Sequence, residues 1–365
     1  MRPRRVHPNL PLLSTRHLSR RALLAGGGAL LAAPYLGSQD ARAQGREITL
    51  PMSGGSFMQA VQSEVTEPFR QQTGITVRMV PGNMKTHAMQ LLAARGRPPF
   101  DVFLGNGEDF VLLLDANRML PLTPERVPSI LEVHEQFKAQ WNGYGSLFDY
   151  FTIGLSYNTQ LLGDPPKSWR EFVDRTARGD FKKQVFFNSL PGGVRGPEVL
   201  ITLARALTGK QEEVDAAFDA IRRMRPNIFK FFNSINDPVV MLLNGEGMVG
   251  PGWDGRVFVA HDESNGRVQF IKPTDGLACN GPPIGVVRGG SEEAAYRFVN
   301  FALSAEVQKA FCEKMFYGAA NTKVQYSPAL ANRLPRPDEV TVADERFMAA
   351  NIKAWIDRWN REIAF

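Results

Sequence analysis

The sequence predicts an α/β protein of two lobes that are joined by crossing strands. Three observations lead to this fold class. Strand-like and helix-like segments alternate over residues 47–116, prolines interrupt the pattern over 117–168, and a second alternating series follows over 169–271. A Gly- and Pro-rich stretch at 273–283 then precedes the apolar run 284–287, which we expect to return to the first sheet.

The first series consists of short apolar strands separated by helical segments. Gly74 ends the first helix, and strict alternation of strand and helix is typical of parallel strands covered by helices. The expected strands are 47–51, 75–80 and 101–104, and the expected helices are 58–73, 84–95 and 108–116.

The middle of the chain is interpreted as the crossing point between the lobes, with 151–158 (FTIGLSYN) as an isolated strand. In the second series we expect helices at 169–178, 197–207, 212–224, 237–244 and 255–263, and strands at 184–187, 229–232, 247–249 and 268–271. Further helices are expected at 292–303, 305–315 and 344–362. One lobe then comprises 44–153 and 281–325, and the other comprises 154–280 and 326–365.

The N-terminal segment has the build of an export signal. The pair Arg20-Arg21 precedes a glycine-containing apolar run, Ala22–Ala33, and Ala41-Arg42-Ala43 is a cleavage site of the A-x-A type. Adjacent arginines before a weakly hydrophobic run resemble a twin-arginine signal. We therefore predict that residues 1–43 are a twin-arginine signal peptide and that the mature protein is periplasmic. An uncleaved anchor is the alternative, which the alanine-rich site disfavours.

The formal net charge of +6 comes from that segment. Residues 1–43 hold seven arginines, one aspartate and no lysine, so the rest of the chain is formally neutral. Binding to nucleic acid or to an anionic membrane needs an excess of basic surface, which the mature chain does not have. The composition therefore favours a small molecule as the partner and predicts no nucleic acid.

Catalytic signatures are missing from the mature sequence. Its histidines, His87, His134 and His261, lack metal-ligand spacing, and no P-loop, H-E-x-x-H or G-x-S-x-G motif occurs. We predict a binding protein without catalytic residues, metal or cofactor. Cys279 and Cys312 are either joined in a disulfide or present as two free thiols, and the apolar helical setting of Cys312 favours buried thiols.

Eight short motifs follow one another along the mature chain. They are Glu67–Phe69, Thr73–Val77, Phe100–Phe103, Thr152–Asn158, Lys167–Trp169, Asn244–Glu246, Trp253–Gly255 and Tyr317–Asn321. In this order and spacing they resemble the periplasmic solute-binding proteins of ATP-binding-cassette (ABC) importers, in particular the spermidine/putrescine-binding type. The resemblance implies a two-lobe periplasmic binding protein-like fold of type II, with a ligand cleft between hinge-connected lobes. It also implies a small-molecule solute, and an inner-membrane permease with its ATPase as partners; we expect a monomer.

The strand-end rule places candidate ligand contacts in the loops after three strands. Open α/β sheets bind ligands in the crevice beyond the carboxyl ends of their strands. The rule selects Ser53, Gly55, Ser56, Phe57, Gly105, Asn106, Asn188 and Ser189.

The resemblance adds positions from the family's binding cleft. It implies aromatic ligand contacts from Phe57, Trp253 and Tyr317, and an ammonium-binding acid at Glu198; Asp254 adjoins Trp253 in its motif. Rings of this kind pack on alkyl chains or cations. The alternatives are core packing for the aromatic residues and a favourable helix-dipole position for Glu198.

Two departures from the polyamine-binding pattern bear on the ligand. Arg256 stands where putrescine binders carry an aspartate, and Pro282 falls near another of their acids, with Asn280 close to a second aromatic position. In a cleft without these acids, a bound dication would keep one buried charge without a partner, which is costly in free energy. Glu198 with Arg256, and Arg195 beside them, suits a ligand that carries both an amine and an acid. An exposed, solvated Arg256 is the alternative.

Three functions fit these observations. A transport receptor is the leading one, and a periplasmic sensor subunit that presents its ligand to a membrane receptor would use the same lobe closure. An exported enzyme on the same scaffold is disfavoured because the sequence lacks a catalytic constellation.

Overall fold

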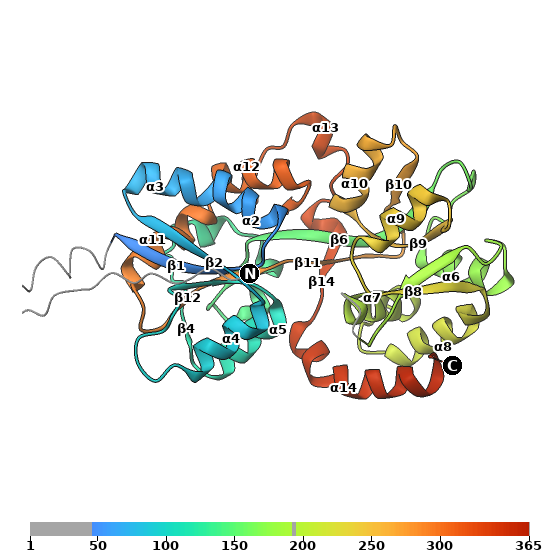
Figure 1. The fold of residues 1–365 in the computed structure, drawn as a ribbon, viewed down its shortest axis with the longest axis horizontal. Helices are drawn as coiled ribbons and strands as arrows, with labels where there is room; N and C mark the ends of the chain where they lie inside the picture. The colour runs from blue at the N-terminus through green and yellow to red at the C-terminus, as the bar shows by residue number, and fades with distance from the viewer. Residues whose placement is uncertain (1–45, 192–194, 365) are drawn as a thin grey trace, which may run out of the picture.

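A computed structural model describes residues 46–191 and 195–364 of the protein. Figure 1 shows two lobes side by side, with strands β6 (Asp149–Asn158) and β11 (Leu277–Asn280) crossing between them. The predicted signal peptide lies outside the described residues. None of the helices in the described ranges combines the length and the hydropathy that a membrane span requires.

The first lobe contains the N-terminal strands and the returning strand β12. Its strands are β1 (Glu47–Met52), β2 (Thr76–Pro81), β3 (Val102–Leu104), β4 (Met119–Leu120), β5 (Ser146–Leu147) and β12 (Pro283–Val287). β1 and β2 pair in parallel, as predicted. β12 pairs antiparallel with β3, β4 and β5, which confirms the predicted return of the chain. β3 lies in this antiparallel sheet, so its predicted place in one parallel unit with β1 and β2 was wrong.

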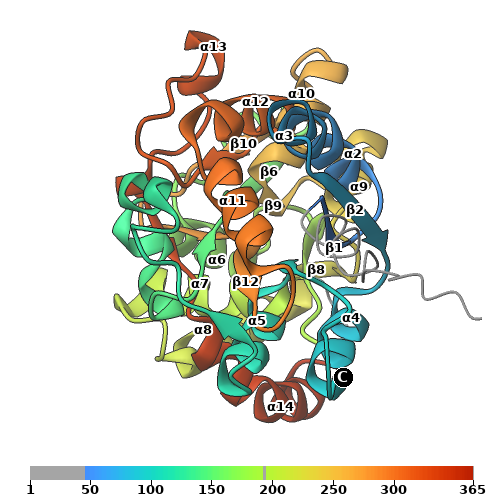
Figure 2. The same cartoon turned by 90° about the vertical axis from the view of Figure 1, so that its left-hand side faces the viewer.

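Helices cover the sheets of this lobe, and α11 packs against β12 (Figure 2). They are α2 (Ser56–Val61), α3 (Glu67–Thr73), α4 (Met84–Ala93), α5 (Gly107–Asp115), α11 (Glu292–Ala302) and α12 (Ala305–Met315). A π-helical turn, Gln62–Thr66, joins α2 to α3, so the predicted helix over 58–73 is one helical segment. Gly74 ends it with a φ of 71°, a conformation that costs glycine little.

The second lobe is built on a sheet with the strand order β14-β11-β6-β9-β7-β8. Besides β6 and β11, its strands are β7 (Val185–Asn188), β8 (Ile228–Phe232), β9 (Val249–Trp253), β10 (Val268–Ile271), β13 (Gly318–Ala319) and β14 (Val340–Val342). The expectation that 151–158 is isolated was wrong, because β6 pairs with β9, β10, β11 and β13. The predicted strand 247–249 was misplaced, since β9 extends to Trp253.

The helices of the second lobe agree closely with the prediction. They are α6 (Trp169–Arg178), α7 (Gly196–Thr208), α8 (Val214–Met224), α9 (Asp237–Asn244), α10 (Asp254–Glu263) and α14 (Glu345–Glu362), with a short α13 (Pro328–Ala331). Local signals explain the agreement. The Ser168 hydroxyl accepts a hydrogen bond from the amide of Glu171 at 3.0 Å where α6 begins, and Gly179 ends that helix with a φ of 83°.

Buried apolar side chains form two large clusters. One draws on residues 48–150, 277–320 and 340, and the other on 151–268 and 343–363. Helix α14 contributes Met348, Trp355 and Trp359 to the second cluster and also contacts α5 of the first lobe. The lobe boundaries expected from the sequence stay a prediction. Both cysteines are buried free thiols, as expected.

Candidate functional site

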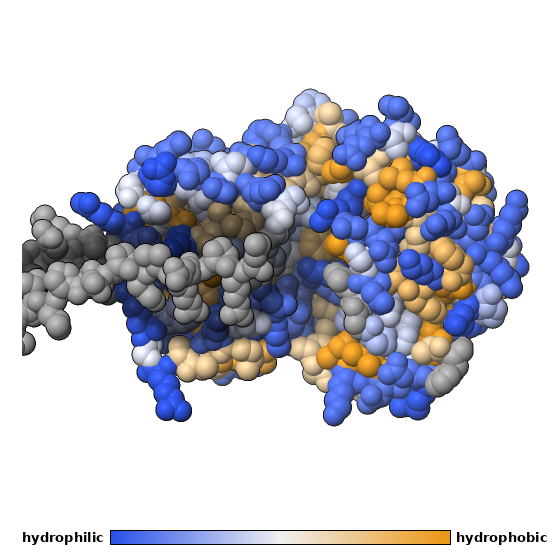
Figure 3. All heavy atoms as spheres, viewed as in Figure 1, coloured by the Kyte–Doolittle hydropathy of each residue, from blue (hydrophilic) through white to orange (hydrophobic). Residues whose placement is uncertain are grey.

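Two adjoining pockets open between the lobes, where the space-filling surface dips in Figure 3. We call them the small pocket, of about 160 Å³, and the acidic pocket, of about 550 Å³. Asn106 and Arg195 line both. The small pocket is otherwise lined by aromatic and apolar side chains together with Ser53, Asp149 and Arg256, and the acidic pocket contains Glu108, Glu198 and Glu345.

The structure brings nine of the predicted residues to these pockets. The small pocket is lined by Ser53, Phe57, Gly105, Asn106, Arg195, Trp253, Arg256 and Tyr317, and Glu198 lines the acidic pocket. Gly55, Ser56, Asn188, Ser189, Asp254 and Asn280 line neither. Gly55 forms the turn before α2 with a φ of 83°, and the Ser189 hydroxyl donates to the carbonyl of Pro191.

Asp254 is buried behind the wall of the small pocket. Its carboxylate accepts hydrogen bonds from the amide and hydroxyl of Thr152, at 3.0 and 2.7 Å, and from the amide of Gly255 at 2.7 Å. Burial raises the pKa of Asp254 to about 7, and these hydrogen bonds oppose that rise. Its bonds tie the start of α10 to β6 and thereby hold Trp253 and Arg256 in place.

Aromatic rings shape the small pocket. Trp253 is 2% exposed and packs edge-to-face on Phe232, and Tyr317 lies against Phe151 with ring centroids 6.1 Å apart. Tyr317 also lies close to Gly255, where an added Cβ would approach its ring to 2.6 Å. Burial raises the pKa of Tyr317 to about 12, so its hydroxyl stays protonated at neutral pH.

Several polar groups of the small pocket have no partner in the described part of the chain. They are the indole Nε1 of Trp253, the Nε of Arg256 and both carboxyl oxygens of Asp149. Buried polar groups in proteins are nearly always hydrogen-bonded, so each of these is unusual. Together they provide two donors and one carboxyl group inside a cavity that residues of both lobes line.

Asp149 was missed by the sequence reasoning. It lies at the start of β6, whose predicted range began two residues later, and it is completely buried. Burial raises the pKa of its carboxyl group well above the usual range, the Asp254 carboxylate adds to the rise, and the Arg195 guanidinium opposes it. The available signal was an acidic residue just before the predicted strand 151–158.

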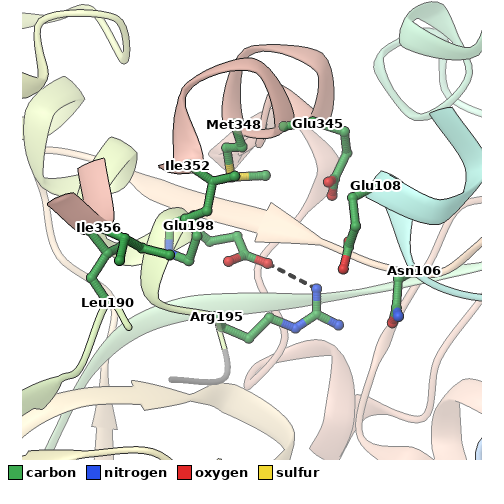
Figure 4. Close-up of a pocket in the computed structure, with 11 residues that line it drawn as sticks. Asn106, Glu108, Leu190, Arg195, Glu198, Glu345, Met348, Ile352 and Ile356 are labelled. Carbon is green, nitrogen blue, oxygen red and sulfur yellow. Dashed lines mark hydrogen bonds and ion pairs between the residues drawn. The ribbon is translucent and has the colours of Figure 1, made fainter. Parts of the chain in front are cut away.

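The acidic pocket differs because Glu198 and Glu345 already have hydrogen-bond partners in the protein; Figure 4 shows the pair of Glu198 with Arg195. The Arg195 guanidinium donates to Glu198 at 2.9 Å, and the Asn280 amide donates to Glu198 at 3.1 Å and to Glu345 at 2.8 Å. Burial raises the pKa of Glu345 to about 8, with the Glu198 and Glu108 carboxylates adding to the rise. Glu108 and Glu345 were missed because their helices α5 and α14 meet only in the folded chain.

The chain matches the family of bacterial extracellular solute-binding proteins over residues 64–335. It belongs to this family. A solved structure of a candidate extracellular solute-binding protein from Bordetella parapertussis is 45% identical, with a TM-score of 0.85 over 87% of this chain and 99% of the other. An ABC transporter structure from Clostridium perfringens is 21% identical, with a TM-score of 0.74 over 87% and 99%.

A curated relative of this solute-binding protein comes from Salmonella typhimurium. It is named a candidate 2-aminoethylphosphonate-binding periplasmic protein and is 23% identical over 80% of this chain and 81% of its own. These three relatives are named for solute binding or for ABC transport. The fold expectation of two type II lobes is confirmed. The family match does not separate ligand types, so the spermidine/putrescine type stays a prediction.

The geometry of this solute-binding protein suits a small polar molecule. Among the residues that the structure describes, no group of three or more His, Cys, Asp or Glu side chains is placed to hold a metal ion. His87 packs on Phe100, and the Nδ1 of His261 lies 2.9 Å from the carbonyl oxygen of Val268. The small pocket therefore offers side-chain hydrogen bonds, charges and aromatic surfaces to a solute.

Proposed function

We propose that this solute-binding protein captures a small amine-type solute that also carries an acidic group, by closing its two lobes over it. It then delivers the solute to an inner-membrane ABC permease that works with its ATPase. The observation that carries the proposal is the pair of buried donors, Trp253 Nε1 and Arg256 Nε, in a cavity lined by both lobes. A carboxylate or phosphonate oxygen would accept from both.

The amine part of the proposal rests on the acids around the two pockets. The two pockets contain four acidic side chains beside two guanidinium groups. Asp149 and Arg256 line the small pocket, Glu108, Glu198 and Glu345 line the acidic pocket, and Arg195 lines both. A cationic group on the solute therefore finds carboxyl partners in this region. The Salmonella typhimurium relative is named for 2-aminoethylphosphonate, which combines an ammonium with a phosphonate. We extend that ligand class, an amine with a compact anion, to this chain.

Spermidine or putrescine is the second candidate, because the motifs resemble that type. Arg256 disfavours it, since a second ammonium would lie near a guanidinium in a small cavity of about 160 Å³. Transport is preferred to a sensor role on the family match, and both use the same binding step. We further propose that the twin-arginine signal exports the folded protein to the periplasm, where it works as a monomer with the predicted lobe boundaries.

Thermal unfolding with a ligand panel tests the proposal. The mature protein is unfolded and refolded to remove carried-over solute, then heated with 2-aminoethylphosphonate, γ-aminobutyrate, ethylphosphonate and putrescine. A ligand at a thousand times its Kd stabilises by about 4 kcal/mol and raises Tm by several degrees. We expect the two zwitterions to raise Tm. If putrescine alone raised Tm, the solute would be a polyamine and not a zwitterion. If the protein converted a bound ligand chemically, it would be an enzyme and not a transport receptor.

A further inference from the structure

We propose that Asp149 binds the ammonium group of the solute, as one end of a two-ended site whose anion-binding end is Arg256 with Trp253. This inference deepens the proposed function and rests on it. It assigns the ammonium to a carboxyl group in the small pocket instead of to Glu198, the acid that the family resemblance suggests.

The setting of Asp149 supports this role. Its side chain is fully buried, lines the small pocket, and has neither carboxyl oxygen hydrogen-bonded within the described ranges. The backbone also holds it in place, because Asp149 pairs with Ala319 of β13 and a Cβ at Gly281 would collide with its carbonyl oxygen. A buried carboxyl group without a partner is costly, and a bound ammonium provides the missing donors.

Glu198 lacks this opportunity. One of its oxygens, Oε1, already accepts from the Arg195 guanidinium and from the Asn280 amide. An ammonium that approached Glu198 would compete with a guanidinium already in contact, whereas at Asp149 it meets a carboxyl group with both oxygens available. The difference in hydrogen bonding therefore selects Asp149.

The groups around Asp149 determine whether a proton is released when the solute binds. The charged and titratable groups that face it are Arg195, Asp254, Cys312, Tyr317 and Tyr326. The thiol and both phenols are neutral at pH 7, because burial raises their pKa values. Burial also raises the pKa of Asp149, which favours the protonated carboxyl group in the ligand-free protein. When an alkylammonium binds, the O–H bond breaks, the proton passes to bulk water, and the carboxylate pairs with the cation.

The two-ended site defines a class of solutes. One carboxyl group at one end and one guanidinium with an indole N–H at the other fit a compact molecule with a single ammonium and a single anionic group. Aminoalkylphosphonates and short amino acids belong to this class. Simple anions lack the first group, and diamines lack the second.

Titration calorimetry of the whole mature protein tests the assignment. The probes are 2-aminoethylphosphonate, γ-aminobutyrate and ethylphosphonate, which lacks the amine, each with the unsubstituted protein, Asp149→Asn and Asp262→Asn. Asp262 is a matched control, because it is an exposed carboxylate of α10 paired with Arg333 at 2.8 Å. We expect Asp149→Asn to weaken zwitterion binding about 100-fold or more, to leave ethylphosphonate unaffected, and Asp262→Asn to change neither.

The same titrations in two buffers of different ionisation enthalpy count the protons. We expect release of up to one proton per bound zwitterion at neutral pH, and none for Asp149→Asn. If zwitterions bind and Asp149→Asn retains their full affinity, the Asp149 assignment is wrong while the proposed function stands. If the unsubstituted protein binds no amine-bearing probe, the proposed function fails and this inference with it. Should Asp149→Asn unfold, the comparison of 2-aminoethylphosphonate with ethylphosphonate on the unsubstituted protein still decides, because equal affinities would exclude an ammonium partner.

Discussion

The small pocket and the acidic pocket share Asn106 and Arg195 but differ in whether their polar side chains are hydrogen-bonded within the protein. In the acidic pocket, Glu198 and Glu345 are hydrogen-bonded to side chains of the protein itself. In the small pocket, Asp149, Trp253 and Arg256 present buried polar atoms without a partner in the described residues. Unpaired buried atoms cost folding free energy, so they indicate where a ligand supplies the partners.

The comparison also explains why the larger pocket is not the stronger candidate. The acidic pocket has more than three times the volume of the small pocket, about 550 against about 160 Å³. Its acids come from α5, α7 and α14. Arg195 pairs with Glu198 (Figure 4), and Asn280 donates hydrogen bonds to Glu198 and Glu345. Because Glu198 and Glu345 already have partners in the protein, whereas Asp149 has none within the described residues, we assign the small pocket to the solute.

The largest expected effect comes from the anion-binding end of the small pocket. Arg256→Ala removes the guanidinium that would pair with the solute's anion, so affinity for 2-aminoethylphosphonate should fall about 100-fold, which corresponds to about 2.7 kcal/mol. Arg256 has an unpaired Nε, so the Tm of the ligand-free protein should hardly change. Calorimetry with the unsubstituted protein as reference measures the affinity. Unchanged affinity would mean that Arg256 is a solvated helix residue.

The next prediction concerns the pH dependence of stability that the acidic pocket produces. Burial and two neighbouring carboxylates raise the pKa of Glu345 from 4.5 to about 8, so the folded protein holds a proton that the unfolded chain releases. The resulting stabilisation is complete below about pH 4.5 and is lost as the pH rises through about 8. In Glu345→Gln the amide stays neutral at every pH. As the pH rises through this window, we expect the unfolding free energy of the unsubstituted protein to fall by about 2 kcal/mol more than that of the variant.

Urea unfolding at pH 5, 6.5 and 8 measures this difference. The amide oxygen introduced by Glu345→Gln can still accept from Asn280, as the Glu345 carboxyl group does at 2.8 Å, so the substitution isolates the titration from the hydrogen bond. Equal pH slopes for the two proteins would show that Glu345 is ionised in the folded state. The affinity for 2-aminoethylphosphonate should be the same in both, since Glu345 does not line the small pocket.

The sequence predicted the helices better than the sheets and the site. Capping signals are local, and the correctly predicted range of α6 lies between its caps, Ser168 and Gly179. β9 was predicted too short because Gly250, Pro251 and Gly252 indicate a turn. In the fold these glycines allow close packing, since a Cβ at Gly252 would lie 2.5 Å from the Ser156 hydroxyl on the neighbouring strand.

The acids of the site show the same limit. Asp149 and Glu345 become functional candidates only through contacts made far along the chain: Asp149 by lining a cavity with Arg256, and Glu345 by meeting Asn280. Sequence periodicity reports burial and local structure but not which distant polar groups remain unpaired. Trp253 and Tyr317 were predicted because they lie in motifs, and Arg256 because it replaces an acid directly after one of them; Arg195 was added as a further guanidinium beside Glu198 and Arg256.

The smallest effect distinguishes an unpaired indole from a paired one. Trp253→Phe keeps an aromatic ring but removes the Nε1 donor, so affinity for 2-aminoethylphosphonate should fall about 10-fold, while the ligand-free protein keeps its Tm because no protein bond is lost. Trp169→Phe is the matched control. The Trp169 Nε1 donates to the carbonyl of Gly276 at 3.1 Å, so its loss should cost about 1 kcal/mol of unfolding free energy and leave affinity unchanged.

Calorimetry and thermal unfolding of both tryptophan variants decide between the two interpretations of Trp253. If Trp253→Phe lowered Tm without weakening the ligand, its indole would belong to the core, as that of Trp169 does. The two residues are both nearly fully buried, at 2% and 0% exposure, so burial alone cannot separate them. What separates them is the hydrogen bond that Trp169 makes and Trp253 does not make within the described chain, and this is the property by which the small pocket as a whole differs from its neighbour.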